Sequence, residues 1–402
     1  MNLSRNQRLQ LMWGKAKRLL EFLAYGLFDT LMLGSALCKP RSNSRLAAIV
    51  HLELLGDYVL WLPYGRALVS HLHKQGWQVV LVLNLAVATL AKNHFPECKV
   101  VTVDRRRFVK NWHVRHRFLR NLRKLCVDVT YIARHPRDTL VDDAVVRALG
   151  AGAWGFDSTF ADRPWIDQLL NRRLYTRLLP VMVGLHQTLR HRVFVQAVGV
   201  PAESLVPPVD FPNGLKAPVD GPYLVIAPGA SQGKRRWPMH QFVAVVRQIL
   251  DHHQGWRCLV VGTAAEREIG EQIAASLGEQ ADNRAGCTDV LGLVGCIAHA
   301  RLVLGNDSAA VHIAAACGVP GVAVVGGGHF GRCFPYDSRE ALVLRLPATV
   351  ARTMDCFGCD WICRYRVAAG KPYPCIEAVT VEAVWEGVKT ALAEGCGSPG
   401  SG

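Results

Sequence analysis

Short apolar runs of strand length recur along the chain, and stretches long enough for a helix separate them. The first set covers residues 46–52, 79–83, 100–103 and 127–132. This alternation is typical of βαβ units, in which the strands are parallel and helices cover the sheet. It predicts an α/β protein.

A second set of runs follows a proline-rich segment, residues 201–218, whose five prolines and lack of periodicity predict a linker. Because 402 residues exceed what one core sustains, we predict two Rossmann-like, doubly wound domains that face a cleft, with ligands outside the carboxyl ends of their strands. The later strands are predicted at residues 223–226, 258–261, 302–304, 322–325 and 342–344, and an amphipathic helix at 381–393. The predicted boundaries are an amino-terminal segment 1–42, a first domain 43–200, a second domain 219–390 and a flexible tail 391–402.

Composition narrows the class of partner. Half of the residues are apolar, which argues against extensive disorder, and the net charge of +15 predicts attraction to nucleic acid, anionic lipid or a phosphorylated sugar. Thirteen cysteines are scattered through apolar stretches, among them Cys126, Cys258 and Cys317. Such scatter favours buried thiols in a reducing cytoplasm.

The amino-terminal segment 1–42 combines basic residues with an apolar stretch that Glu21 and Asp29 interrupt. It is too marginal to predict a membrane-spanning helix, and it lacks an obvious cleavage site for a signal peptide. Two interpretations stay open. The segment either lies in the interface of an anionic membrane or forms a helix that packs on its own domain.

Two polar loops follow predicted strands. In the first, Gly56 permits a tight turn and Asp57 opens the next helix, where an aspartate can equally serve as a helix cap. The second, residues 227–238, holds Gly229 and Ser231 before the cations Lys234, Arg235 and Arg236. Backbone amides beside fixed positive charge suit a diphosphate, although a cation cluster is often a solvated surface.

A third loop carries Asp307 and Ser308 at the end of a predicted strand, followed by small residues that let a helix amino terminus approach a ligand. Asp307 either contacts that ligand or caps the helix, and His312 is either a site residue or an interior imidazole. A glycine turn centred on Gly327 is expected to bring further bare backbone to the same site.

These three motifs, in this order and at about this spacing over residues 45–390, resemble the bacterial heptosyltransferases of glycosyltransferase family 9. The matching segments are Gly56-Asp57 through Leu62-Pro63, the Pro228-Gly229-Ala230 loop up to Trp237-Pro238, and Gly305 through His312 to Pro320. The resemblance implies a GT-B fold, inversion at the anomeric carbon and no metal or other cofactor. It also implies transfer of heptose from ADP-heptose to lipopolysaccharide core or a related lipid-linked anionic glycan, in the cytoplasm or at the inner face of the inner membrane.

The same resemblance assigns residue roles. Asp57 would be the catalytic base, Lys234 or Arg235 would hold the departing diphosphate, and Glu266 would contact ribose hydroxyls. Asp307, Ser308 and His312 fall on the donor-binding element. The chain has Ala309-Ala310 where the family usually has Gly-Pro, and Gly-Gly-Gly-His where it usually has Gly-Pro-Thr, so the identities of nucleotide and sugar stay open.

Two further groups have several interpretations. Cys356, Cys359, Cys363 and Cys375 are spaced as a zinc site, a labile disulfide pair or unligated thiols. A basic run over residues 105–124 is either a solvated helix face or a surface for acidic groups of the acceptor. Its candidate contacts are Arg105, Arg106, Arg107, Arg117 and Arg120.

Two rival functions belong to other classes. A family member that has lost catalysis would bind a sugar nucleotide or act as a scaffold, but the retained Asp57 speaks against it. A nucleic-acid-binding protein would explain the charge but not the three loops, and the sequence shows no recognised nucleic-acid module. We therefore expect no nucleic-acid partner.

Overall fold

The computed structural model describes residue 20 and residues 24–29, 45–157, 172–180, 184–205, 211, 215–340 and 344–393. They divide into two compact units, and the chain passes from the first to the second at residues 204–205, within the predicted linker. Two short segments, Leu55–Pro63 and Gly184–Leu189, are grouped with the second unit, although the sequence placed them in the first domain.

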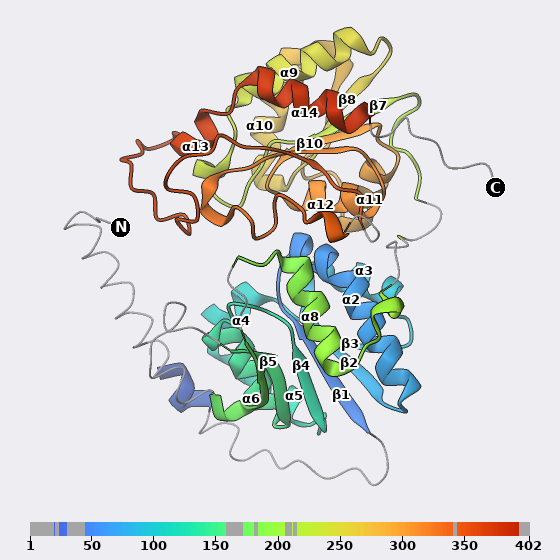
Figure 1. Ribbon diagram of the computed structural model, residues 1–402, viewed down its shortest axis with the longest axis vertical. Coiled ribbons are helices and arrows are strands. Elements are labelled where there is room, and N and C mark those ends of the chain that lie inside the picture. Colours follow the sequence, from blue (N-terminus) through green and yellow to red (C-terminus); the bar gives the residue numbers. More distant parts are fainter. Residues whose placement is uncertain are drawn as a thin grey trace. The chain divides into compact units, whose positions relative to one another are not determined.

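The first unit is built on a six-stranded parallel sheet in the order β3-β2-β1-β4-β5-β6, as in dinucleotide-binding folds. Its strands are β1 Leu46–His51, β2 Gln78–Asn84, β3 Lys99–Val103, β4 Val129–Ile132, β5 Gly152–Phe156 and β6 Tyr175–Leu179. The helices are α2 Leu55–Lys74, α3 Ala88–His94, α4 Arg105–Lys110, α5 Trp112–Arg123, α6 Ala144–Leu149 and α8 Gln187–Val198 (Figure 1).

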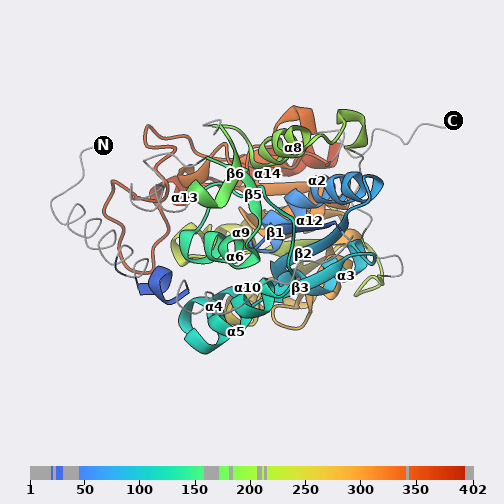
Figure 2. The ribbon, with the colours of Figure 1, turned by 90° about the horizontal axis from the view of Figure 1, so that it is seen from below.

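The core of the first unit lies between this sheet and its helices. Val50 and Val82 of the central strands pack with Phe108 of α4, Leu119 of α5 and Val145 of α6. Figure 2 shows α4 and α5 next to each other at one edge of the unit. The near-continuous apolar strands follow from a parallel sheet that is covered on both faces.

The second unit repeats the same topology, with the strand order β12-β11-β10-β7-β8-β9. Its strands are β7 Tyr223–Ala227, β8 Arg257–Val260, β9 Ala281–Asn283, β10 Leu302–Asn306, β11 Gly321–Val324 and β12 Ala348–Val350. The helices are α9 Met239–His252, α10 Arg267–Leu277, α11 Val290–Ala298, α12 Ala309–Ala316, α13 Pro374–Glu377 and α14 Val381–Ala393 (Figure 1). The predicted two-sheet α/β class is confirmed.

The largest buried side chain of the second core is Trp237, which lies between the loop after β7 and the start of α9. Its indole Nε1 donates a hydrogen bond of 2.8 Å to the carbonyl of Val379, before α14. The predicted last helix, 381–393, is confirmed. The predicted strand 342–344 is not, because Leu344 lies outside any strand, residues 342 and 343 fall outside the described part, and β12 forms the edge instead.

Residues 24–29 of the amino-terminal segment pack on the first unit. The Tyr25 hydroxyl donates to the carbonyl of Val109 over 2.6 Å, and the Asp29 carboxylate accepts two bonds from the buried guanidinium of Arg115. These contacts favour packing on the domain for this part of the segment, and the remainder of 1–42 lies almost entirely outside the described residues. Within the described residues, no helix has the length and apolar character to cross a bilayer.

The cysteines mostly follow the expectation of buried or partly buried thiols. Cys258 is buried and free, and Cys317 is half-buried and free. Cys126 departs from it, because it is disulfide-bonded.

Candidate active site

The strand order of the second unit predicts where a ligand would bind. Strands β7 and β10 are neighbours, and the chain leaves them toward opposite sides of the sheet, which is where ligands bind in open α/β sheets. The loops after these two strands are the second and third sequence motifs.

Asn306, the last residue of β10, connects the two loops through hydrogen bonds of its side chain. Its side-chain Nδ2 donates to the carbonyls of Pro228, at 2.8 Å, and Gly229, at 3.1 Å, while its Oδ1 accepts the backbone N–H of Trp237 at 3.0 Å. The side chain is buried, so these bonds are made away from water. No role was predicted for Asn306 from the sequence. An amide side chain at the end of an apolar run was the feature that could have indicated one.

The cations of the second motif differ in exposure. Lys234 and Arg235 lie in a 3-10 turn, Gly233–Arg235, where Lys234 is exposed and Arg235 is half-buried. The guanidinium of Arg235 lies 4.0 Å from the ring centre of Trp361, a cation–π contact that holds it in place. Ser231 is exposed on the same loop.

Glu266 lies against the glycine of this loop. A Cβ on Gly229 would fall 1.9 Å from Glu266 Oε1, so only glycine allows the two to approach. The other oxygen, Oε2, accepts the backbone N–H of Thr263 at 2.8 Å in a capping box. Oε1 therefore faces the loop while Oε2 is engaged in the capping box.

Asp307 and Ser308 stand at the start of α12. Burial raises the pKa of Asp307 to about 6, and the nearby Asp57 carboxylate adds to the rise while Arg235 and Arg332 oppose it. Ser308 is the N-cap residue but its side chain makes no capping bond, and among the described residues its buried hydroxyl has no hydrogen-bond partner. The site thus gathers two carboxylates, two guanidinium groups and a free hydroxyl.

His312 is an interior residue of α12. Its Nδ1 shares a hydrogen bond of 2.6 Å with the Tyr336 hydroxyl, and its ring stacks on Phe334 at a centroid distance of 4.7 Å. Burial, and to a lesser degree His186, lowers its pKa to about 3, so the imidazole is neutral. The geometry favours the interior-imidazole interpretation over a direct donor contact.

Asp57 belongs to the first turn of α2, which is grouped with the second unit. The helix begins at Leu55 with Leu54 as its N-cap, so Asp57 is not the capping residue. Its Oδ1 accepts a hydrogen bond of 3.2 Å from Nε2 of Gln187. Gly56 allows the close approach, since a Cβ there would lie 3.0 Å from the His312 ring and 3.4 Å from Ala309 Cα.

The glycine turn at Gly327 has a different surrounding from the one we expected. A Cβ on Gly327 would fall 2.2 Å from the ring of Phe357, and one on Gly328 would fall 2.2 Å from Trp361. The bare backbone therefore admits the aromatic side chains of the cysteine-containing loop. These glycines support the packing of that loop, and a contribution of the turn to the ligand site stays a prediction.

The basic run of the first unit is mostly exposed. Arg106, Arg107, Arg117 and Arg120 face solvent, whereas Arg105 forms an ion pair of 2.5 Å with Asp138. Arg115 is buried against Tyr25 and Phe108 and pairs with Asp29. The run thus combines a structural arginine with an exposed cationic face.

A buried charged network lies at the corresponding strand ends of the first unit, after β1 and β4. Glu53 pairs with Arg134 at 3.3 Å, and Arg134 pairs with the fully buried Asp142 at 2.9 Å. Burial, followed by the charges of His191 and Arg134, lowers the pKa of the adjacent His51 well below its usual range. This network was not predicted from the sequence, although polar residues directly after apolar strands could have indicated it.

Two Rossmann-like sheets of identical strand order, with polar loops at the β7/β10 strand ends, define the GT-B class of glycosyltransferase fold. The solved structure of E. coli ADP-heptose lps heptosyltransferase II has this fold, with a TM-score of 0.64 at 18% sequence identity over 87% of this chain and 99% of that one. Residues 182–356 match the family described as Glycosyltransferase family 9 (heptosyltransferase). Over these residues the chain is similar to this family.

The curated proteins to which the chain is similar include two kinds of heptosyltransferase. Lipopolysaccharide heptosyltransferase 2 of Escherichia coli (strain K12) is 33% identical over 110 residues, which are 26% of this chain and 31% of that protein. Lipopolysaccharide heptosyltransferase 1 of Pseudomonas aeruginosa is 28% identical over 301 residues, 69% of this chain and 78% of that protein. The match to the E. coli protein thus spans about a third of its length.

Proposed function

We propose that the chain is an inverting glycosyltransferase that moves heptose from ADP-heptose onto lipopolysaccharide core or a related lipid-linked glycan, with no metal ion in the chemical step. The names of the relatives supply the sugar and the type of acceptor. The observation that carries the proposal is the position of Asp57, whose carboxylate interacts electrostatically with Asp307 at the β7/β10 strand ends. The proposed base and the residues proposed to hold the diphosphate would thus be adjacent in one unit.

Asp57 would act as general base toward the acceptor. As the acceptor hydroxyl oxygen attacks the anomeric carbon, its proton passes to the Asp57 carboxylate, and the bond between that carbon and the diphosphate oxygen breaks. An ordinary aspartate has a pKa of about 3.9, yet it can serve because the proton needs to leave only as the new bond forms. Gln187 fixes the orientation of the carboxylate through its hydrogen bond of 3.2 Å.

The leaving diphosphate carries away the bonding electrons and gains negative charge. Arg235 is the better placed cation to stabilise it, because its guanidinium is half-buried beside Trp361 and near Asp307, while Lys234 is exposed. The glycine loop around Gly229 and the amino terminus of α12 would add backbone N–H groups. Fixed donors of this kind are most effective where charge develops.

The nucleoside part of the donor would reach the opposite end of the same loop. Glu266 Oε1, which lies against Gly229, is available to accept a ribose hydroxyl while Oε2 stays in its capping box. The Ser308 hydroxyl would supply a further polar contact. His312, an interior residue of α12, would stabilise these donor contacts through its packing and would not contact the donor itself.

The acceptor would be held by the first unit. The exposed guanidinium groups of Arg106, Arg107, Arg117 and Arg120 suit phosphate or acidic sugars, and they also suit peripheral contact with an anionic membrane. The protein would act in the cytoplasm, on the inner face of the inner membrane.

Two measurements test this function. A thermal-shift panel of ADP-, GDP-, UDP- and TDP-sugars should show the largest stabilisation with ADP-heptose, since a ligand that binds only the folded chain raises its melting temperature. Transfer to lipopolysaccharide that lacks its heptose residues should follow with the same donor. Stabilisation without transfer would indicate a non-catalytic member of the family, and stabilisation only by duplex DNA would indicate a nucleic-acid-binding protein.

A further inference from the structure

Arg332 lies at the candidate site but has no role in the proposed reaction. It belongs to the loop that follows β11, and its side chain is half-buried. Its Nε lies 3.4 Å from Oε1 of Gln187, and the amide of Gln187 in turn donates a hydrogen bond to Asp57. A single side chain therefore separates this guanidinium group from the proposed base.

The backbone around Arg332 is held in place. The N–H of Arg332 donates to the carbonyl of His329 at 2.9 Å, and the N–H of Gln187 donates to the carbonyl of Arg332 at 2.8 Å. Two residues further along the loop, Phe334 stacks on the His312 ring of α12 with a centroid distance of 4.7 Å. The guanidinium group thus extends from a loop that is anchored to α12.

Arg235 and Arg332 approach each other from different loops. Burial lowers the pKa of Arg235, and the charge of Arg332 adds to that lowering, so the two guanidinium groups are close enough to repel each other. Burial raises the pKa of Asp307, and both guanidinium charges oppose that rise. The carboxylates of Asp307, Asp57 and Asp360 lie near this pair and offset part of the repulsion.

Both guanidinium groups have hydrogen-bond donors that the described residues do not use. A guanidinium group has five N–H donors, and Arg332 uses one of them in its contact with Gln187. The Nε of Arg235 is buried and has no hydrogen-bond partner among the described residues. Within the same part of the chain, neither arginine forms an ion pair with a carboxylate. Two anchored guanidinium groups with unused donors suit phosphate groups, whose oxygens accept such donors in pairs.

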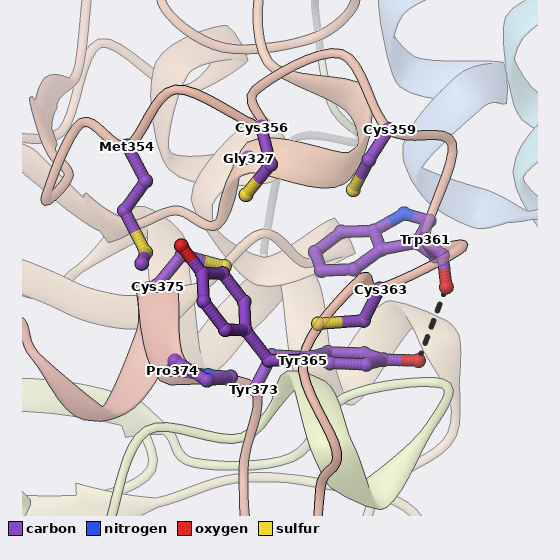
Figure 3. A pocket seen from close by; sticks show the side chains of 10 residues that line it. All are labelled: Gly327, Met354, Cys356, Cys359, Trp361, Cys363, Tyr365, Tyr373, Pro374 and Cys375. Atoms are coloured by element: carbon purple, nitrogen blue, oxygen red, sulfur yellow. Dashed lines mark hydrogen bonds between the residues drawn. The ribbon is translucent and has the colours of Figure 1, made fainter. Parts of the chain in front are cut away.

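The loop between β12 and α13 holds Arg235 in place. The guanidinium group lies over the ring of Trp361, whose carbonyl accepts a hydrogen bond of 3.4 Å from the Tyr373 hydroxyl (Figure 3). The N–H of Tyr373 donates to the carbonyl of Lys234 at 2.8 Å. The four cysteines of this loop and of α13 are free thiols that line the small cavity drawn in Figure 3. The position of Arg235 thus depends on this loop, whereas Arg332 is held by the loop after β11.

The neighbours of each arginine indicate which phosphate group it would contact. In a nucleotide sugar, the distal phosphate is bonded to the anomeric carbon, which is the atom that the acceptor attacks. Because Gln187 links Arg332 to Asp57, Arg332 would lie beside the phosphate next to that carbon. Arg235 belongs to the loop against which Glu266, the proposed ribose contact, is packed. It would therefore lie nearer the nucleoside end of the diphosphate.

We propose that Arg332 is a donor-binding residue that contacts the distal phosphate of the nucleotide sugar and selects a diphosphate over a monophosphate. The inference rests on the proposed function, because it concerns the same donor site. During transfer the acceptor oxygen bonds to the anomeric carbon, and its proton passes to Asp57. The bond from that carbon to the distal phosphate oxygen breaks, and its electron pair stays on that oxygen. Arg332 keeps its protons and stabilises the new charge through hydrogen bonds.

Calorimetric titration with ADP and with AMP tests the proposal, because the two nucleotides differ only in the distal phosphate. The wild type should bind ADP more tightly than AMP. Arg332→Ala should weaken ADP binding about 10- to 100-fold, as expected for the loss of a charge-assisted hydrogen bond, and leave AMP binding unchanged. The matched control is Arg301→Ala, which removes an exposed arginine at the amino-terminal end of β10 and should change neither affinity.

Gln187→Ala separates a phosphate contact from an indirect effect. If Arg332 acted only by holding Gln187, both variants would bind ADP as the wild type does. We expect Gln187→Ala to retain ADP binding and Arg332→Ala to lose it. Should Arg332→Ala fail to fold, Arg332→Gln replaces it, since glutamine keeps most of the side-chain length without the charge.

Unchanged ADP affinity in the folded Arg332 variant, or an equal loss of ADP and AMP affinity, would overturn the role of Arg332. If the wild type binds neither nucleotide, the pairs GDP/GMP, UDP/UMP and TDP/TMP are compared in the same way. A wild type that binds no nucleoside diphosphate contradicts the proposed function itself, and the role of Arg332 is then refuted with it. A wild type that binds one, with a variant that binds it equally well, refutes the role of Arg332 alone.

Discussion

The side-chain amide of Gln187 donates a hydrogen bond of 3.2 Å to Oδ1 of Asp57. Gln187 is buried, and its backbone N–H donates to the carbonyl of Arg332 at 2.8 Å, while Arg332 Nε lies 3.4 Å from its Oε1. The contacts with Arg332 thus hold the Gln187 amide in place, and the amide can keep the Asp57 carboxylate in one orientation. Gln187 is a positioning residue for the proposed base.

Replacing Gln187 with alanine should lower kcat about 10- to 100-fold and leave donor binding unchanged, because a hydrogen bond to a charged group contributes about 1.5–3 kcal/mol. A hydrogen bond donated to a carboxylate favours its charged form, so its loss raises the carboxylate pKa. The acid limb of the kcat/KM profile should therefore move to higher pH. Gln280→Ala, at an exposed position, is the control, and an unmoved limb would argue against a positioning role.

Arg235→Ala should weaken donor binding more than Lys234→Ala. A charge-assisted hydrogen bond in a partly desolvated site is worth about 1.5–3 kcal/mol, which corresponds to about a 10- to 100-fold loss of affinity. Lys234 is exposed, and exposed charges contribute less. Calorimetric titration with ADP-heptose measures both, with Lys389→Ala on α14 as a control, and the reverse ranking would contradict the assignment to Arg235.

Asn306→Asp should destabilise the second unit by about 1–3 kcal/mol, because a carboxylate cannot donate to the two carbonyls that the amide now satisfies. The loop at Pro228 and Gly229 would lose both bonds while the bond from Trp237 remains possible. Urea unfolding gives the change in free energy, compared with Gln280→Ala. An unfolding free energy equal to that of the wild type would show that the loop does not depend on Asn306.

The raised pKa of Asp307 predicts that the free energy of unfolding depends on pH. Its folded pKa of about 6 lies above the ordinary value of 3.8, so between these values the folded chain binds more protons than the unfolded one. The contribution of Asp307 to the free energy of unfolding therefore falls as pH rises from about 4 to about 6, and then levels off. The difference between wild type and Asp307→Asn, measured by urea unfolding across this range, should follow that slope, and a flat difference would refute the raised pKa.

The sequence predicted the central strands well, because a parallel sheet covered on both faces requires continuous apolar runs such as residues 46–52. It missed β5, whose Gly152 and Gly155 are poor strand formers, and β9, which is three polar or small residues long. It also missed β6 and β12. These strands form because they pair with neighbouring strands of the folded sheet. Hydrophobic periodicity and strand propensity in the sequence do not indicate that pairing.

Residues of the candidate site were predictable where they come directly after a strand in the sequence. Asp57, Arg235, Asp307 and Ser308 are brought together as their positions after strands suggested, and their roles stay predictions. Gln187 was not predictable, because it lies far along the chain from Asp57 and only the fold brings the two into contact. The neighbours of the Gly327 turn were not predictable for the same reason, since Phe357 and Trp361 come from a later loop.

The central claim is that Asp57 acts on the acceptor and is not needed to bind the donor, and Asp57→Asn tests it most directly. The variant keeps the shape of the side chain but removes its basicity, so transfer should fall by about 10²- to 10⁴-fold, the usual contribution of a general base. Both quantities are measured on one preparation: the ADP-heptose-induced rise in melting temperature and the initial rate of heptose transfer. We predict an unchanged rise with transfer nearly lost, whereas an equal loss of both, or full transfer by the variant, would contradict the account.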